Sequence, residues 1–448
     1  MNPIRLTTRR ILISMLLVCA VAQAASADQI LTLQDAIELG LKSDETYLIA
    51  QEDLVRASGL VREAKGGAFP NLDFNASYTR NIEIPEIAIG TEKIRFGTKN
   101  EYAAGLTLTQ PIWLGGKVFG ALKVAKYYQS FADYKLDQTR NDVIFELKEA
   151  FFNSKLAGDV VGIYEDALRQ AELNLANVRK MKEQGMASEF DLLRAEVEFA
   201  NIKPQLIKAR NDSQLALINL KNRLGLDPET DVVLTFEFQR SELDSTLDLT
   251  EALQYADAKH PSVQLQDNLV KSYDQAIGIA KADGRPQLSL QSSFQYQKQS
   301  DEFSPTGGGW SDSWSATLFL TFSLFDGRAN SGRVMQARAD YNESYLTLRQ
   351  IRENVLLAVR SAYATWEEAV ASLETQEKTI DQAEEGLRIA NLRYESGIGT
   401  QLEVLSAQTA NTQAKVNYIN AIYDFELAVA GFIRAAGYQQ DITGDENE

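Results

Sequence analysis

Cysteine and histidine are almost absent from this sequence of 448 residues, which contains one of each, Cys19 and His260. Transition-metal sites rely mainly on these two residue types, and nucleophilic triads need a histidine as the base. A phosphate-binding glycine loop followed by lysine is also missing from the sequence. The sequence therefore predicts no metal site, no cofactor and no enzyme. His260 precedes Pro261 near a helix start, which indicates a structural role.

Long hydrophobic runs are missing after the beginning of the chain, where three arginines precede an apolar run over 11–22. The small-x-small sequence at 25–27 follows, so residues 1–27 are predicted to be a secretory signal peptide. Lipidation at Cys19 is the alternative, but Val18 stands where a lipoprotein signal has a small residue. No later run approaches the ~20 apolar residues of a membrane helix.

Positive charge is in the minority, with 45 Lys and Arg against 62 Asp and Glu and a net charge of −17. This balance argues against nucleic acid or anionic lipid headgroups as ligands and suits a surface or lumen that tolerates cations. A charge that only keeps long helices soluble is the alternative.

The sequence contains an internal duplication. The sequence from Leu31 resembles the sequence from Leu247 at an offset of 216 positions, and after Pro111 the offset becomes 212, so that Gly185 matches Gly397. Such self-similarity is typical of a duplicated structural unit. We predict a first repeat at residues 28–230, a connector at 231–246 and a second repeat at 247–437. An acidic C-terminal tail follows at 438–448.

Each repeat is predicted to contain a helix, two strands, a long helix and a shorter returning helix. Strict period-two alternation predicts the strands, at about 70–80 and 101–112, then 286–297 and 313–325. Apolar residues occupy one face of these strands. The other face carries polar side chains, among them Asp73, Asn75, Ser77, Gln291 and Ser293. The segments between paired strands are polar or glycine-rich and are predicted to be exposed loops.

Heptad spacing takes over after each strand pair and predicts coiled-coil packing. The helix from Lys117 to Gln184 would be about 100 Å long at ~1.5 Å per residue. A first helix over 33–66 and the returning helix over 187–224, placed end to end, would match that length. Each repeat is thus predicted to supply one continuous and one broken helical rod.

Strands with an apolar face and a polar face are typical of a transmembrane barrel whose apolar face meets lipid. Four strands are too few to close a barrel, and lipid does not tolerate open strand edges. Several copies of the chain are therefore predicted to share one barrel.

The sequence resembles the TolC-like outer membrane efflux proteins. The resemblance rests on the duplication, on QPIWLGGK at residues 110–117, and on the Y-x-x-G-x-G-T-x-x-E-V-L pattern at residues 394–405. It implies an α+β membrane protein that forms a homotrimer, with a 12-stranded outer membrane barrel continued by an α-helical tunnel in the periplasm. It also implies an exit duct for a tripartite efflux pump or a type I secretion system, with a periplasmic adaptor and an inner-membrane pump as partners.

Glycines interrupt the helical pattern at the two predicted tips. Gly185 and Gly397 are predicted to reverse the chain, because a tight turn between antiparallel helices favours a residue that tolerates positive φ. Gly399 and Thr400, like Ala187 and Ser188, are predicted to start the returning helices, with the hydroxyl residues as N-caps. The resemblance implies that these tips contact the adaptor, whereas the sequence alone requires only turns.

Two carboxylates follow the tips at equal spacing, Asp191 and Glu403. Threefold symmetry would gather three copies of each at a narrow pore end, where they would favour cations. The resemblance implies a constriction there that includes Tyr394. The chain departs from the family pattern by having Ser406 in place of a second aspartate and Gly399 in place of an arginine. Ordinary acidic residues in a first helical turn are the alternative.

A protein of another class would also fit long coiled rods: a barrel-anchored spacer or receptor without transport. Polar strand residues facing a lumen serve no purpose in such a spacer, so we favour the export duct. Ion conductance separates the two hypotheses.

Overall fold

The computed structural model describes residues 29–89, 92–95, 97–236 and 247–439. The predicted signal peptide with Cys19, part of the predicted connector and nearly all of the acidic tail lie outside the described residues. The chain forms two compact units, each described by itself: residues 1–49, 137–260 and 354–448 make the first, and 50–136 and 261–353 the second. Each unit therefore takes segments from both predicted repeats.

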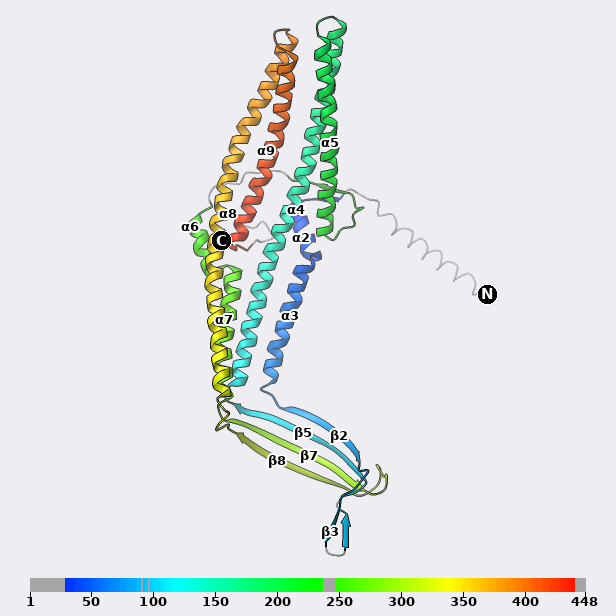
Figure 1. Ribbon diagram of the computed structural model, residues 1–448, viewed down its shortest axis with the longest axis vertical. Helices are drawn as coiled ribbons and strands as arrows, with labels where there is room; N and C mark the ends of the chain where they lie inside the picture. The colour runs from blue at the N-terminus through cyan, green and yellow to red at the C-terminus, as the bar shows by residue number, and fades with distance from the viewer. Residues whose placement is uncertain (1–28, 90–91, 96, 237–246, 440–448) are drawn as a thin grey trace, which may run out of the picture. The chain divides into compact units, whose positions relative to one another are not determined.

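Helices dominate the first unit (Figure 1). Two of them, α4 and α8, have 67 residues each and contribute to both units. The helices that lie wholly or mainly in this unit are α2 (Leu33–Ser43), α4 (Lys117–Glu183), α5 (Glu189–Arg223), α6 (Leu249–Lys259), α8 (Ala329–Glu395) and α9 (Gln401–Ala436). Among the described helices, none is both long and apolar enough to count as a candidate membrane span.

The prediction of one helix over 33–66 is wrong, because α2 ends at Ser43 and α3 (Glu45–Gly66) begins after a break. Asp44 has extended backbone angles, and its carboxylate accepts a hydrogen bond from the Tyr47 backbone N–H at 2.9 Å. This bond satisfies one of the free donors at the start of α3. The second repeat breaks at the matching position: His260 ends α6 and Pro261 begins α7 (Pro261–Ala282).

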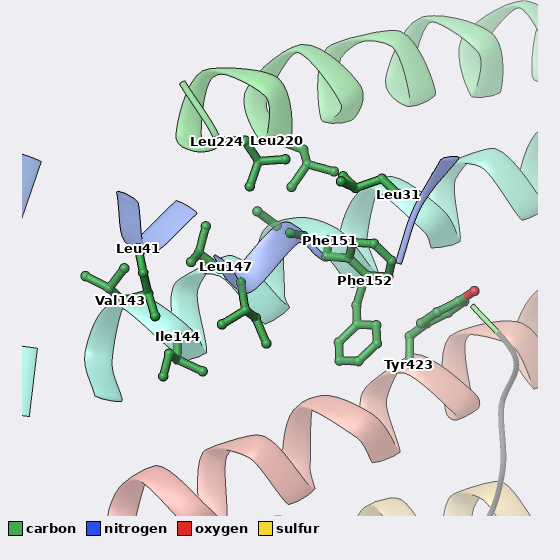
Figure 2. Close-up of a cluster of buried hydrophobic side chains, with 13 residues drawn as sticks. Leu31, Leu41, Val143, Ile144, Leu147, Phe151, Phe152, Leu220, Leu224 and Tyr423 are labelled. Carbon is green, nitrogen blue, oxygen red and sulfur yellow. The ribbon is translucent and has the colours of Figure 1, made fainter. Parts of the chain in front are cut away.

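The main core of the first unit lies between α2, α4, α5 and α9 (Figure 2). Phe151 and Phe152 of α4 are its largest fully buried side chains, and Tyr423 reaches them from α9. Two short strands that the sequence did not predict, β1 (Gln29–Leu31) and β6 (Val232–Leu234), pair in parallel beside this core. Leu31 of β1 is fully buried in it.

The second unit contains an antiparallel sheet of four strands in the order β2, β5, β7, β8 (Figure 1). The strands are β2 (Asn71–Arg80), β5 (Asn100–Leu114), β7 (Gln287–Ser300) and β8 (Trp310–Thr321). The last strand thus ends earlier than the predicted 325. Parts of α3, α4 and α8 also lie in this unit, where Gln266 of α7 donates to the Ser344 carbonyl of α8 at 3.0 Å.

The segment after β2 was predicted to be an exposed loop, and this prediction is wrong in part. It holds a short antiparallel hairpin, β3 (Glu86–Ile89) and β4 (Glu92–Arg95). Strands of four residues give too short a period-two pattern to stand out from a polar loop.

Candidate functional site

The two helix tips of the first unit have the same backbone construction. Gly185 and Gly397 both have φ of 74°, which carries the chain out of α4 and α8. The N–H of the residue after each glycine reaches back to a carbonyl of the last helical turn: Met186 to Met181 at 2.8 Å and Ile398 to Arg393 at 3.0 Å. Such bonds satisfy carbonyls that a helix end leaves free. The reversal therefore depends on the glycines, as the sequence predicts.

Hydroxyl residues cap the returning helices. Ser188 forms a capping box with Asp191: the serine Oγ accepts from the Asp191 N–H at 3.1 Å, and the Asp191 carboxylate accepts from the Ser188 N–H at 3.1 Å. Thr400 accepts from the Glu403 N–H at 3.3 Å. The structure thus places Asp191 at a cap, where its charge also favours the helix dipole.

Gly399 is needed for a different reason than Gly397, because its φ is not positive. A Cβ atom at this position would lie 2.9 Å from the Arg393 Cβ and 2.9 Å from the Tyr394 backbone nitrogen. Real Cβ atoms do not approach other atoms so closely, so any other residue here would force the backbone of the last turn of α8 to shift.

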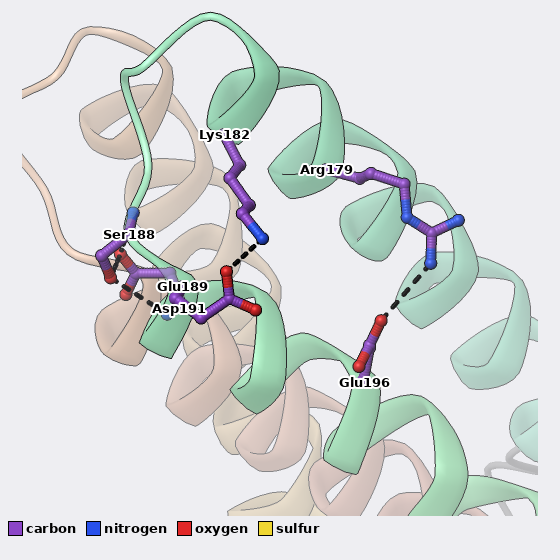
Figure 3. A network of polar contacts seen from close by, with 6 residues as sticks. All are labelled: Arg179, Lys182, Ser188, Glu189, Asp191 and Glu196. Atoms are coloured by element: carbon purple, nitrogen blue, oxygen red, sulfur yellow. Dashed lines mark hydrogen bonds and ion pairs between the residues drawn. The ribbon is translucent and has the colours of Figure 1, made fainter.

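Ion pairs join α4 to α5 near the first tip, as Figure 3 shows. Lys182 contacts Glu189, and Arg179 lies 3.4 Å from Glu196. In the second repeat, a different pair joins the helices: Arg393 of α8 lies 3.4 Å from Glu403 of α9. All these side chains are partly exposed, so each pair contributes at most about 1 kcal/mol.

The positions of the second repeat that match the first-tip ion pairs hold neutral residues. At the offset of 212, Lys182 and Glu189 correspond to Tyr394 and Gln401. Gln401 is 2% exposed, and its side-chain amide has no hydrogen-bond partner among the described residues. An unsatisfied buried amide costs stability.

Tyr394 connects the two tips. Its ring packs against the cluster of Val178, Leu192 and Ala195, which belongs to α4 and α5. Burial raises the pKa of the Tyr394 hydroxyl above its usual value, and the charge of Asp191 raises it further. The structure therefore brings two of the three predicted constriction residues together, whereas Glu403 pairs with Arg393.

A cavity of about 830 Å³ opens between α4 and α8 near the tips, and the sequence did not predict it. Its lining is mostly polar and includes Asn174, Asn177, Arg388 and Asn391. Asn411 of α9 also lines it; this residue is 4% exposed, and its carbonyl oxygen has no hydrogen-bond partner within the described part of the chain. One signal was available in the sequence: an asparagine stands in the apolar heptad seam.

The predicted polar strand residues lie on one face of the sheet in the second unit. Asp73 lies opposite Thr107, Thr107 opposite Ser293, and Ser293 opposite Ser315, which makes a polar row across all four strands. Neighbouring rows on this face contain the other predicted residues, Asn75, Ser77 and Gln291.

The opposite face of the sheet is apolar. One row across it contains Phe74, Leu106, Phe294 and Trp314 in register. Phe74 is 69% exposed and Trp314 is 79% exposed. Large apolar side chains exposed in a continuous patch mark a surface that another apolar phase or partner covers.

Comparison with known proteins finds the same family in both repeats. The family model described as "Outer membrane efflux protein" matches the chain twice, over residues 41–226 and 252–438. Protein CyaE of Bordetella pertussis is 24% identical over 407 residues, covering 91% of this chain and 84% of the relative. Proteases secretion protein PrtF of Dickeya chrysanthemi is 21% identical over 408 residues, covering 88% of this chain and 86% of the relative.

Solved structures share the fold. The crystal structure of the Campylobacter jejuni CmeC outer membrane channel has a TM-score of 0.76 at 18% identity, covering 92% of this chain and 87% of that one. The matched family model describes efflux proteins of the outer membrane, and the CmeC structure is that of an outer membrane channel. The resemblance and the outer membrane location predicted from the sequence are both confirmed. The chain belongs to the outer membrane efflux protein family and has the fold of its exit channels.

Proposed function

We propose that this protein is the outer membrane exit duct of a tripartite efflux or type I secretion system. Three copies would build a 12-stranded barrel in the outer membrane and an α-helical tunnel in the periplasm. The duct is passive, because energy for export comes from the inner-membrane pump. Repeats at 28–230 and 247–437, joined by a connector at 231–246, are the organisation that we propose for the chain.

One observation carries this proposal: the four-stranded sheet has an apolar face, a polar face and two unpaired edge strands, β2 and β8. An open strand edge is not tolerated in the bilayer core, because its N–H and C=O groups have no partner there. Single-chain barrels of this type have at least about eight strands, so a four-strand sheet needs further copies to close. Three copies, as in the family that the sequence resembles, would supply 12 strands.

The two faces of the sheet suit a channel wall. Exposed aromatic residues such as Phe74 and Trp314 would meet lipid. The polar row that contains Asp73 and Ser293 would face a water-filled lumen.

Exposed apolar residues on α5 support self-association. Ile207 and Leu215 are 68% and 57% exposed on this helix. Their counterparts at the offset of 212, Ile419 and Leu427 of α9, pack against the main core of the first unit. A helix of the same origin therefore has a covered stripe in one repeat and an uncovered stripe in the other, which fits a second copy of the chain.

The helix tips are proposed as the gate and the adaptor contact. Three copies of Asp191, Tyr394 and Glu403 would form the constriction, where clustered carboxylates favour cations. The turns at Gly185 and at Gly397, Gly399 and Thr400 would contact the periplasmic adaptor. Met186 and Ile398, the residues after the first glycine of each turn, are exposed apolar side chains suited to a protein partner.

Single-channel conductance of the purified protein in a planar bilayer tests this function. Asp191→Asn and Glu403→Gln remove the charges while keeping a polar side chain at each position, so the Asp191 cap is disturbed as little as possible. Glu353→Gln, a change at an exposed residue of α8, is the matched control. We expect small cation-selective currents in the wild type and the control, with weaker selectivity in the two tip variants.

Inserted protein that stays silent in all variants would refute transport and favour the spacer hypothesis. Currents whose selectivity is the same in the wild type and in both tip variants would leave the duct standing and remove the acidic gate.

A further inference from the structure

The edge strands of the sheet, β2 and β8, are the strands through which copies of the chain would join. We infer that β8 of one copy pairs antiparallel with β2 of the next copy, with residues 316–321 opposite residues 80–75. This inference rests on the proposed barrel and goes beyond it by fixing which residues meet. It follows from the internal duplication and from the observed strand registers.

The two hairpins of the sheet have one and the same register. In the first, Asn71 lies opposite Thr109, and in the second, Gln287 lies opposite Thr321. Moving β2 by the offset of 216 and β5 by the offset of 212 converts the first pair into the second. The duplication is therefore preserved in the strand pairing as well as in the sequence.

The junction between the hairpins, β5 with β7, shows how the end of one unit joins the start of the next. Leu106 of β5 lies opposite Phe294 of β7. The residue that corresponds to Leu106 in the second hairpin is Leu318, and the residue that corresponds to Phe294 in the first hairpin is Tyr78. If successive hairpins join alike around a ring, Leu318 of one copy lies opposite Tyr78 of the next.

The neighbouring pairs follow in the same way. Gly105 with Gln295 becomes Thr317 with Thr79, and Leu108 with Ser292 becomes Leu320 with Ala76. A ring in which all hairpins join alike has the same stagger at every junction, and the observed β5/β7 junction then gives the register between copies.

Side-chain chemistry agrees with this register. Tyr78 and Leu318 lie on the apolar face of their own strands, since Tyr78 pairs with Tyr102 and Leu318 with Leu290. Thr79 and Thr317 lie on the other face, and a cross-strand threonine pair is stabilising. A shift of one residue would place each apolar side chain beside the polar row, which the alternation forbids.

Disulfide formation between engineered cysteines tests the register. The pair Thr79→Cys with Thr317→Cys is expected to link neighbouring copies, because residues directly opposite have Cβ atoms about 4.5–5.5 Å apart. Ala76→Cys with Leu320→Cys is a second pair. Directly opposite pairs alternate between two hydrogen-bonding classes, and the two engineered pairs belong to different classes, so one of them has the closer spacing.

A link within one chain is excluded by geometry. Position 79 is on one outer strand and position 317 on the other, with β5 and β7 between them. Three strand spacings of about 4.8 Å separate them, which no disulfide spans. Oxidation must therefore join different copies, and a ring of three gives a covalent trimer on a non-reducing gel. The unsubstituted chain, whose one cysteine is Cys19, is the background control.

Two slipped pairs complete the experiment: Thr317→Cys with Ser77→Cys, and Phe319→Cys with Thr79→Cys. Each moves the register by two residues and keeps both cysteines on one face, where the diagonal distance of about 7–8 Å prevents a disulfide. We expect covalent trimer from at least one matched pair and no covalent product from either slipped pair. Conductance is measured on each variant under reducing conditions.

Conducting protein that links through a slipped pair, or through none, would overturn the inferred register and leave the proposed duct intact. Protein that neither assembles nor conducts, with the unsubstituted chain behaving alike, would overturn the proposed function itself.

Discussion

Removing the ring of Tyr394 is expected to loosen the resting tips. This side chain of α8 packs on Val178, Leu192 and Ala195 at the α4/α5 tip, and it is half-buried there. Full burial of a large apolar side chain contributes about 1.5–3 kcal/mol, so the half-buried ring contributes about 1–2 kcal/mol per copy. Because 1.4 kcal/mol is a factor of ten, Tyr394→Ala should raise the ratio of open to closed tips about 5- to 30-fold for each copy in the proposed gate.

Single-channel recording measures this ratio as the fraction of time spent in the larger conducting level. Tyr394→Phe is the matched control, since it keeps the ring contacts and removes only the hydroxyl. We expect the phenylalanine variant to behave like the wild type. An unchanged open fraction in Tyr394→Ala would refute the role of the ring contact. Equal opening in both variants would assign the effect to the hydroxyl beside Asp191 instead.

Three further changes test other parts of the structure. Gly399→Ala should destabilise the second tip by about 1–3 kcal/mol through overpacking, whereas Gly386→Ala, with nothing within 4 Å of the new Cβ, should stabilise α8 by about 0.5–1 kcal/mol. Hydrogen exchange should therefore be faster at the tip amides of Gly399→Ala and slower at the α8 amides of Gly386→Ala. Tip amides of Gly399→Ala that exchange no faster than in the wild type would contradict the predicted overpacking. Burial lowers the pKa of His260 to about 4, below its unfolded value of about 6.5. As the pH falls, the unfolded chain binds a proton at this position before the folded chain does, so the free energy of unfolding decreases between about pH 6.5 and pH 4. His260→Gln should therefore lose less Tm than the wild type between pH 7.5 and 5, and equal losses would argue against the buried neutral imidazole. Tyr423→Phe removes the hydrogen bond that the tyrosine donates to Asp159 at 2.6 Å and should cost about 1–3 kcal/mol in unfolding free energy, measured by denaturant titration; an unchanged midpoint would show that the bond adds nothing.

Much of the fold could be predicted from the sequence because its signals are local and repeated. The period-two pattern placed the strands, and the glycines at 185 and 397 placed the reversals, since positive φ at a helix end is a property of the residue itself. The helix break at Asp44 was missed, because a capping carboxylate looks like any other polar residue in a helical pattern. The β3/β4 hairpin was missed because its strands are short.

At the tips, the sequence by itself determined the turns, the caps and the identity of the charged residues. Only the tertiary structure decided how these charges are used. Glu403 is paired with Arg393 of the preceding helix, which comes within reach only after the chain reverses, whereas the Asp191 carboxylate remains in the local Ser188 cap. The contact of Tyr394 with the other coiled coil joins residues far apart in the chain, which no local pattern encodes.

In the sheet, the duplication in the sequence determined two matching hairpins, because each repeat carries the same alternation on both sides of a connecting segment whose length differs by four residues. Tertiary structure decided that β5 pairs with β7, in one particular register, and that β2 and β8 are left as the edges. Strand order is a non-local property: backbone hydrogen bonds form between any extended segments, and only packing of the whole chain selects the partners.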